Sequence, residues 1–162
     1  MRKDLEETAE EVANREVRDQ LVEQVVARSE VHFPEVLVQE QVTDALRSQA
    51  KNLEDRGLTL DDFLRAREMD FAAYERELRE DARRRIRTQL VLEQIAEQED
   101  VQVTDEDLDA EIERMAEGAG IPLATMQAFL EKRENTLRSM RVPILLRKVV
   151  DLLVENARIS EE

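Results

Sequence analysis

Residues 71–104 read FAAYERELREDARRRIRTQLVLEQIAEQEDVQVT, and this stretch contains neither glycine nor proline. Its first half carries apolar residues at helical spacing on one face: Phe71, Tyr74, Leu78, Ala82, Ile86 and Leu90. Its second half contains LVLEQIA (residues 90–96), which is apolar around most of a helix and must be buried from several sides. About thirty helical residues span about 45 Å, whereas a compact domain of this length has a radius of gyration of about 15 Å. We therefore expect one long helix that joins a compact body to a part projecting from it.

The composition is typical of a nearly all-helical chain whose helices carry much exposed surface. Of the 162 residues, 39% are charged and only 3% are aromatic, and there are three glycines, three prolines and no cysteine. A chain of this length forms one domain, or one elongated unit, with a core of its own. The lack of cysteine excludes disulfides, thiolate catalysis and cysteine-ligated zinc.

The formal net charge of −15 argues against nucleic acid or an anionic membrane as the main partner. The opening residues are too densely charged for a signal peptide. The longest uncharged run, residues 118–130, is too short to span a bilayer. We therefore expect a soluble protein of the cytoplasm. The helical pattern is already under way at Met1, which suggests a fragment of a longer protein.

Apolar stripes predict further helices on either side of the quoted stretch. We expect them at residues 2–27, 34–56, 60–66, 105–117 and 122–130, with a last helix after Asn135. Asp70 and Thr59 are suited to capping helix starts, and Thr104 with Asp107 resembles a capping box.

Glycine and proline indicate where these helices end or bend. Gly57 is expected to end one helix, and Gly118 and Gly120 to end another, since a glycine can adopt the positive φ of a helix C-terminus. Pro143 lies inside the last apolar stripe, so we expect a kink or a restart there.

The apolar residues fall into two classes along the chain. Residues 21–26, 86–96 and 144–154 are strongly aliphatic, which is typical of a shared core. The aromatic residues all lie in the more polar segments between them: Phe33, Phe63, Phe71, Tyr74 and Phe129. We therefore predict an all-α fold, an elongated helical body with two projecting helical-hairpin arms. Residues 1–162 then form a single domain, with arm 1 at about 34–80, arm 2 at about 104–142, and the body at 1–30, 86–100 and 143–160.

Four stretches, in this order, carry a family resemblance: VHFPEVLVQEQV (31–42), GLTLDDFL (57–64), ARRRIRTQLVLEQIAEQEDVQVTDEDLDAEIERMA (82–116) and LLRKVVDLLVENARIS (145–160). Together they resemble the C-terminal domain of trigger factor, the bacterial ribosome-associated chaperone family. The resemblance implies the two-armed fold that is related to SurA-type periplasmic chaperones. It also implies a concave surface that holds unfolded or nascent polypeptides and assists their folding, without ATP or another cofactor.

Members of this family carry two further domains that we do not expect in these 162 residues. The ribosome-binding domain contains a Gly-Phe-Arg motif that is absent here, and the peptidyl-prolyl isomerase domain needs many more strand residues and glycines. We therefore expect no enzymatic activity, and contact with the ribosome only through the missing N-terminal domain.

A holding surface must suit many sequences, and flexible methionines and accessible aromatic rings repack at low cost. The high net charge would keep such a surface soluble. The residues that meet these needs are Leu60, Phe63, Leu64, Met69 and Phe71 on arm 1, and Met115, Ile121, Leu123, Met126, Phe129 and Met140 on arm 2. The alternative is that these side chains only close the two hairpins.

Other patterns do not support a chemical site. The acids from Asp105 to Glu113 lack the glycine turn of a calcium loop, and acids in a first helical turn favour the helix dipole in any case. His32 is the only histidine, which excludes a carboxylate di-metal bundle and a convincing Ser-His-Asp triad. The arginines of residues 83–87 scatter around their helix among acids, as on a solvated or salt-bridged face. We predict no catalytic residue, metal or cofactor.

A second function class stays open: a structural helical scaffold or dimerisation module without general substrate binding. A scaffold has one fixed partner, whereas a holding chaperone binds many unfolded chains weakly and ignores their folded forms. Self-association is compatible with both.

Overall fold

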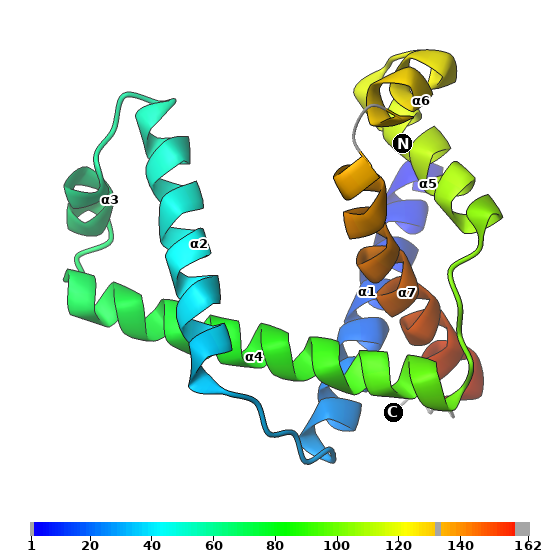
Figure 1. Cartoon of the computed structure of the whole chain (residues 1–162), viewed down its shortest axis with the longest axis horizontal. Helices are drawn as coiled ribbons and strands as arrows, with labels where there is room; N and C mark the ends of the chain where they lie inside the picture. The colour runs from blue at the N-terminus through cyan, green and yellow to red at the C-terminus, as the bar shows by residue number, and fades with distance from the viewer. Residues whose placement is uncertain (1, 132–133, 158–162) are drawn as a thin grey trace. The chain divides into compact units, whose positions relative to one another are not determined.

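The computed structural model describes residues 2–131 and 134–157, and these residues form seven helices and no strand (Figure 1). Residues 158–160 of the predicted body lie outside the described residues. The all-α prediction is confirmed. The helices are α1 (Arg2–Ala27), α2 (Glu35–Glu54), α3 (Leu60–Ala66), α4 (Phe71–Gln98), α5 (Asp105–Ala119), α6 (Leu123–Glu131) and α7 (Glu134–Asn156).

The predicted helix starts are capped as the sequence indicated. Thr59 accepts a hydrogen bond from the backbone N–H of Asp62 at 3.2 Å, and the Asp62 carboxylate accepts one from the N–H of Thr59 at 3.1 Å. Thr104 and Asp107 form the same capping box ahead of α5. Asp70 accepts from the N–H of Ala73 at 2.6 Å at the start of α4. Each cap satisfies N–H groups that have no partner inside the helix.

One predicted helix end is wrong, and the restart that was one of two possibilities at Pro143 does not occur. Gly118 lies inside α5, and only Gly120, with φ 66°, has the left-handed conformation that ends the helix. A single left-handed residue is enough to bond the last carbonyl groups, so the earlier glycine stays helical at some loss of stability. Helix α7 continues through Pro143 without a restart. Proline inside a helix removes one backbone donor, and the surrounding turns sustain the helix here.

The chain packs as two compact units. Unit 1 comprises residues 1–28 and 91–162, and unit 2 comprises residues 29–90. Helix α4 contributes its first part to unit 2 and its last two turns to unit 1. The segment predicted as arm 1 lies wholly within unit 2, whereas the segment predicted as arm 2 lies in unit 1 together with most of the predicted body.

Unit 2 is built on the crossing of α2 and α4 (Figure 1). Val38 and Val42 of α2 are 0% and 1% exposed and pack against Ala82 and Ile86 of α4. Arg79 of α4 reinforces the crossing, because its guanidinium donates to side chains of α2. The predicted apolar face of α4 is therefore the face that forms this core.

Helix α3 closes the other end of unit 2. Its Leu64 is buried, as is Tyr74 near the start of α4. The ring of Phe63 meets the ring of Tyr74 edge-on, with centroids 5.4 Å apart. The guanidinium of Arg67 lies 5.6 Å from the Phe63 centroid and pairs with Glu77 at 3.2 Å.

Unit 1 has two separate aliphatic clusters. The first joins α5, α6 and α7 through buried Ile112, Ala116, Met126 and Leu130, with Met115, Leu137 and Met140 around them. The second joins the end of α4 to α7 through Leu92, Ala96 and Val149, with partly buried neighbours that include Val101 and Leu145. Helix α1 lies against α7, where Arg18 pairs with Asp151 at 2.6 Å.

Candidate functional site

The polar side chains that the structure describes are all at least partly exposed. Among the side chains that the structure describes, those of residues 12–130 and 136–157, there is no group of three or more His, Asp or Glu that could share a metal ion. None of the side chains classed as buried in that part of the chain is polar or charged. General acid–base and metal chemistry both depend on such partly desolvated polar groups.

The acids at the start of α5 have partners on α7. Asp105 pairs with Arg141 at 3.4 Å, Asp107 with Lys148 at 2.5 Å, and Glu111 with Arg147 at 2.8 Å. The hydrogen bond from Lys148, followed by the one from the Thr104 backbone, lowers the pKa of Asp107. These carboxylates are therefore engaged in joining two helices, which the sequence did not indicate.

Glu111 is the most strongly held of these acids. Its side chain is only 12% exposed and also accepts from Arg114 one turn along α5. Hydrogen bonds from Arg114 and then Arg147 lower the pKa of Glu111 to about 2. The two guanidinium groups therefore favour the ionised form of Glu111.

The arm 1 residues predicted to bind substrate divide by exposure. Phe71 is 46% exposed, whereas Leu60, Phe63 and Met69 are half-buried and Leu64 is 7% exposed. Leu64 therefore belongs to the core of unit 2 in this conformation. Sequence reasoning missed Leu58, which is 47% exposed beside Gly57 and lies outside any helical stripe.

The arm 2 residues divide in the same way. Ile121 and Leu123 are each 38% exposed and Phe129 is 51% exposed. Met115 and Met140 are half-buried against the first cluster of unit 1, and Met126 is buried within it at 8%. Phe129 precedes the buried Leu130 by one residue, which turns its ring about 100° away from the core-facing side of α6.

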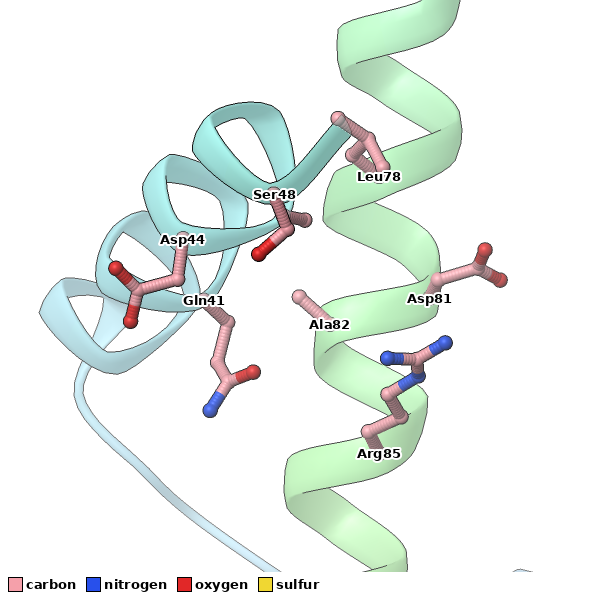
Figure 2. A pocket seen from close by; sticks show the side chains of 8 residues that line it. Gln41, Asp44, Ser48, Leu78, Asp81, Ala82 and Arg85 are labelled. Carbon is pink, nitrogen blue, oxygen red and sulfur yellow. The ribbon is translucent and has the colours of Figure 1, made fainter. Parts of the chain in front are cut away.

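A shallow groove with an apolar floor follows α2 and α4 in unit 2. Two depressions of about 300 Å³ and about 220 Å³ share Gln41 and Asp44 as lining residues. Ala82 lies between the two helices in the larger depression, while Asp44 stands on α2 and Asp81 and Arg85 on α4 (Figure 2). The small side chains of Ala45 and Ala82 line the larger depression, whereas Leu37, Ile86 and Leu90 line the smaller one. The sequence contained a signal for the groove, an alanine inside the apolar face of α4.

Unit 1 contains one further depression of interest, of about 260 Å³. Its apolar lining comes from all three helices of the first cluster, with Leu108 and Ile112 from α5, Leu130 from α6 and Leu137 from α7. Asp105 and Asp109 supply acidic groups to the same lining. Both units thus combine exposed apolar side chains with shallow apolar hollows and charged edges.

Among the described residues, no helix is long and apolar enough to cross a membrane.

Arg83 pairs with Glu35 and Arg84 with Asp81, so two of the clustered arginines are engaged in ion pairs within unit 2.

Comparison with known proteins gives consistent matches. A family model described as the bacterial trigger factor protein (TF) C-terminus matches residues 1–155. Trigger factor from Acetivibrio thermocellus is 34% identical over 159 residues, which cover 98% of this chain and 37% of that protein. Trigger factor from Bacillus cereus is 34% identical over 157 residues, which cover 97% of this chain and 36% of that protein.

A solved structure of domains of trigger factor from Thermotoga maritima superimposes with a TM-score of 0.71 at 25% identity, covering 89% of this chain and 83% of that one. The chain spans little more than a third of the length of the curated relatives it matches. Because the family model covers nearly all 162 residues and the helical architecture is shared with a solved member, this chain belongs to the trigger factor C-terminus family.

Proposed function

We propose that this chain is an ATP-independent chaperone domain that holds unfolded or nascent polypeptides on apolar surfaces and assists their folding. One observation carries the proposal. Nine large apolar side chains of the described residues are at least 37% exposed, on a chain with a net charge of −15. Exposed apolar side chains provide non-specific contacts, and the charge keeps the free domain in solution.

The holding surface is proposed to centre on the exposed members of the predicted set: Phe71, Ile121, Leu123 and Phe129. Half-buried Leu60, Phe63, Met69, Met115 and Met140 lie around them and can contribute by changing rotamer. Buried Leu64 and Met126 are left to the core. The division into arm 1 (34–80), arm 2 (104–142) and body is part of the same proposal.

The domain is proposed to act in the cytoplasm and without a cofactor. It would not be an enzyme, because the isomerase activity of the family belongs to another domain. Contact with the ribosome would likewise require the family's N-terminal domain. The alternative function, a fixed scaffold or dimerisation module, would use the same exposed side chains to pair with a second copy or one dedicated partner.

The test is an NMR titration of the methionine methyl groups with a permanently unfolded protein, and in parallel with the same protein folded. Met69, Met115 and Met140 are expected to shift with the unfolded form only, whereas buried Met126 serves as an internal control. Phe71→Ser and Phe129→Ser are each expected to weaken binding by roughly 3- to 10-fold, since losing one exposed aromatic contact costs about 1 kcal/mol. If no methyl responds at roughly millimolar unfolded protein while light scattering shows a dimer, the scaffold function replaces the holding function.

A further inference from the structure

Helices α5 and α7 of unit 1 meet through two kinds of contact. Beyond Glu111, α5 packs on α6 and α7 through Ile112 and Ala116 in the first aliphatic cluster. The first two turns of α5, residues 105–111, contain only one large apolar side chain, Leu108, and that side chain lines the 260 Å³ depression. The start of α5 therefore has one large apolar side chain, and the acids around it make polar contacts with α7.

These polar contacts connect the start of α5 to α7 at several points. Arg141, Lys148 and Arg147 of α7 pair with Asp105, Asp107 and Glu111 of α5, respectively. Arg141 and Lys148 also donate to the segment before α5, Arg141 to the carbonyl oxygen of Val103 at 3.1 Å and Lys148 to that of Gln102 at 2.8 Å. We call these three ion pairs and two hydrogen bonds the charged row.

The charged row differs physically from the clusters on either side of it. Its cations are partly accessible to ions, with the side chains of Arg141, Arg147 and Lys148 48%, 46% and 33% exposed, whereas Glu111 is 12% exposed. Exposed ion pairs contribute little each, and salt screens them over distances of about 8 Å at about 0.15 M. Salt does not screen the aliphatic contacts of Ile112 or Val149, so raising the ionic strength weakens the charged row, and the exposed Arg18–Asp151 pair, more than these aliphatic contacts.

We propose that the charged row is a salt-sensitive latch, which releases the first two turns of α5 from α7 while both aliphatic clusters stay formed. Release uncovers Leu108 and the α7 side of the depression, at Leu137. The opened segment stays joined to the rest of α5, but helix propagation without tertiary packing is only weakly favourable, so its end also frays. That the uncovered side chains add to the surface that holds unfolded chains rests on the proposed function, whereas the salt-sensitive release of α5 does not.

The test is amide hydrogen exchange of the whole 162-residue chain between about 20 mM and about 500 mM NaCl, a range over which the screening length falls several-fold. Amides of residues 108–113 are expected to exchange at least roughly 5-fold faster at high salt, and amides of residues 145–153 to change less than 2-fold. Equal acceleration of both segments, or no salt effect on residues 108–113, would overturn the latch.

A pair of variants on one carboxylate sharpens the test. Arg147→Gln and Arg114→Gln each remove one guanidinium from Glu111, but only Arg147 belongs to α7. Arg147→Gln is expected to raise exchange of residues 108–113 at low salt and to reduce its salt dependence, and Arg147→Lys to restore most of the protection. Arg114→Gln is expected to leave the salt dependence unchanged. The same effect from Arg114→Gln as from Arg147→Gln would show that Glu111 acts only within α5 and would reject the latch.

The link to substrate holding is measured separately. With the latch weakened in Arg147→Gln, the affinity for a permanently unfolded protein is expected to rise roughly 2- to 5-fold at low salt, through the added surface at Leu108. If residues 108–113 exchange faster in Arg147→Gln but its affinity for the unfolded protein is unchanged, the latch stands and only its link to substrate holding is rejected. Absence of binding in the parent chain rejects the proposed function and leaves the exchange result standing.

Discussion

Replacing Val42 by alanine tests whether the α2–α4 crossing is the core of unit 2. Val42 is 1% exposed and packs with Val38, Ala82 and Ile86. The substitution removes two buried methyl groups, which at about 0.8 kcal/mol each amounts to about 1.6 kcal/mol. The residual cavity adds roughly 1 kcal/mol, and the higher helix propensity of alanine recovers about 0.5 kcal/mol. We therefore expect the free energy of unfolding of unit 2 to fall by about 2 kcal/mol.

The same helix offers a matched control and the chain offers a local probe. Val36 is 59% exposed, so Val36→Ala loses little burial and is expected to change stability by less than about 0.5 kcal/mol. Tyr74 is the only tyrosine of a chain without tryptophan, and it is 6% exposed within unit 2. Its fluorescence therefore reports the urea unfolding of unit 2 specifically. A loss below about 0.5 kcal/mol for Val42→Ala, or an equal loss for Val36→Ala, would refute the described packing.

Three further predictions concern unit 1. The pKa of Glu111 is lowered from 4.5 to about 2, so its stabilising effect is fully present above pH 4.5 and is lost as the pH falls through about 2. Acid titration of helix content should show this loss, and Glu111→Gln should reduce the change in helix content between these two pH values. An acid profile that is unchanged in Glu111→Gln would contradict the stabilising role of the Glu111 carboxylate. Thr104→Ala should destabilise the start of α5 by about 1 kcal/mol, as measured by hydrogen exchange, and Thr104→Ser should stay close to the parent chain. Equal protection in all three chains would show that the capping box does not contribute to the stability of α5. Gly118→Ala should raise the stability by up to about 1 kcal/mol, because Gly118 is helical with open space around its Cα. Gly120→Ala should lower the stability by about 1 kcal/mol, because φ is 66° at Gly120. If calorimetry gave the opposite order of stabilities, the helix would end at Gly118.

The local features of this chain were predictable because they depend on residues three or four positions apart. Asp62 and Asp107 lie three residues after their capping threonines, and that spacing alone indicates the reciprocal hydrogen bonds. The apolar face of α4 is equally local, since Tyr74, Ala82 and Ile86 repeat at helical spacing and are all buried. The end of α5 was harder, because two nearby glycines fit the same signal and only one adopts a positive φ.

The candidate surface was predictable by residue type but not by exposure. Phe129 and Met126 both looked suited to binding unfolded chains, yet one is 51% exposed and the other 8%. Three positions along one helix separate them, and what decides their exposure is where α5 and α7 pack against α6. Helical periodicity gives the faces of a helix, but it does not say how wide a face its neighbours cover.

The sequence by itself determined that the chain is all-α and where its main helices start. Its motifs also indicated the family that the comparisons then established. Only the tertiary structure decided that the acids of α5 pair with cations of α7, that Leu64 and Met126 are core, and that an open groove follows Ala82. The physical reason is distance along the chain. Capping and amphipathicity arise within a few residues, whereas Glu111 and Arg147 are 36 residues apart and meet only because the packing of three helices brings them together.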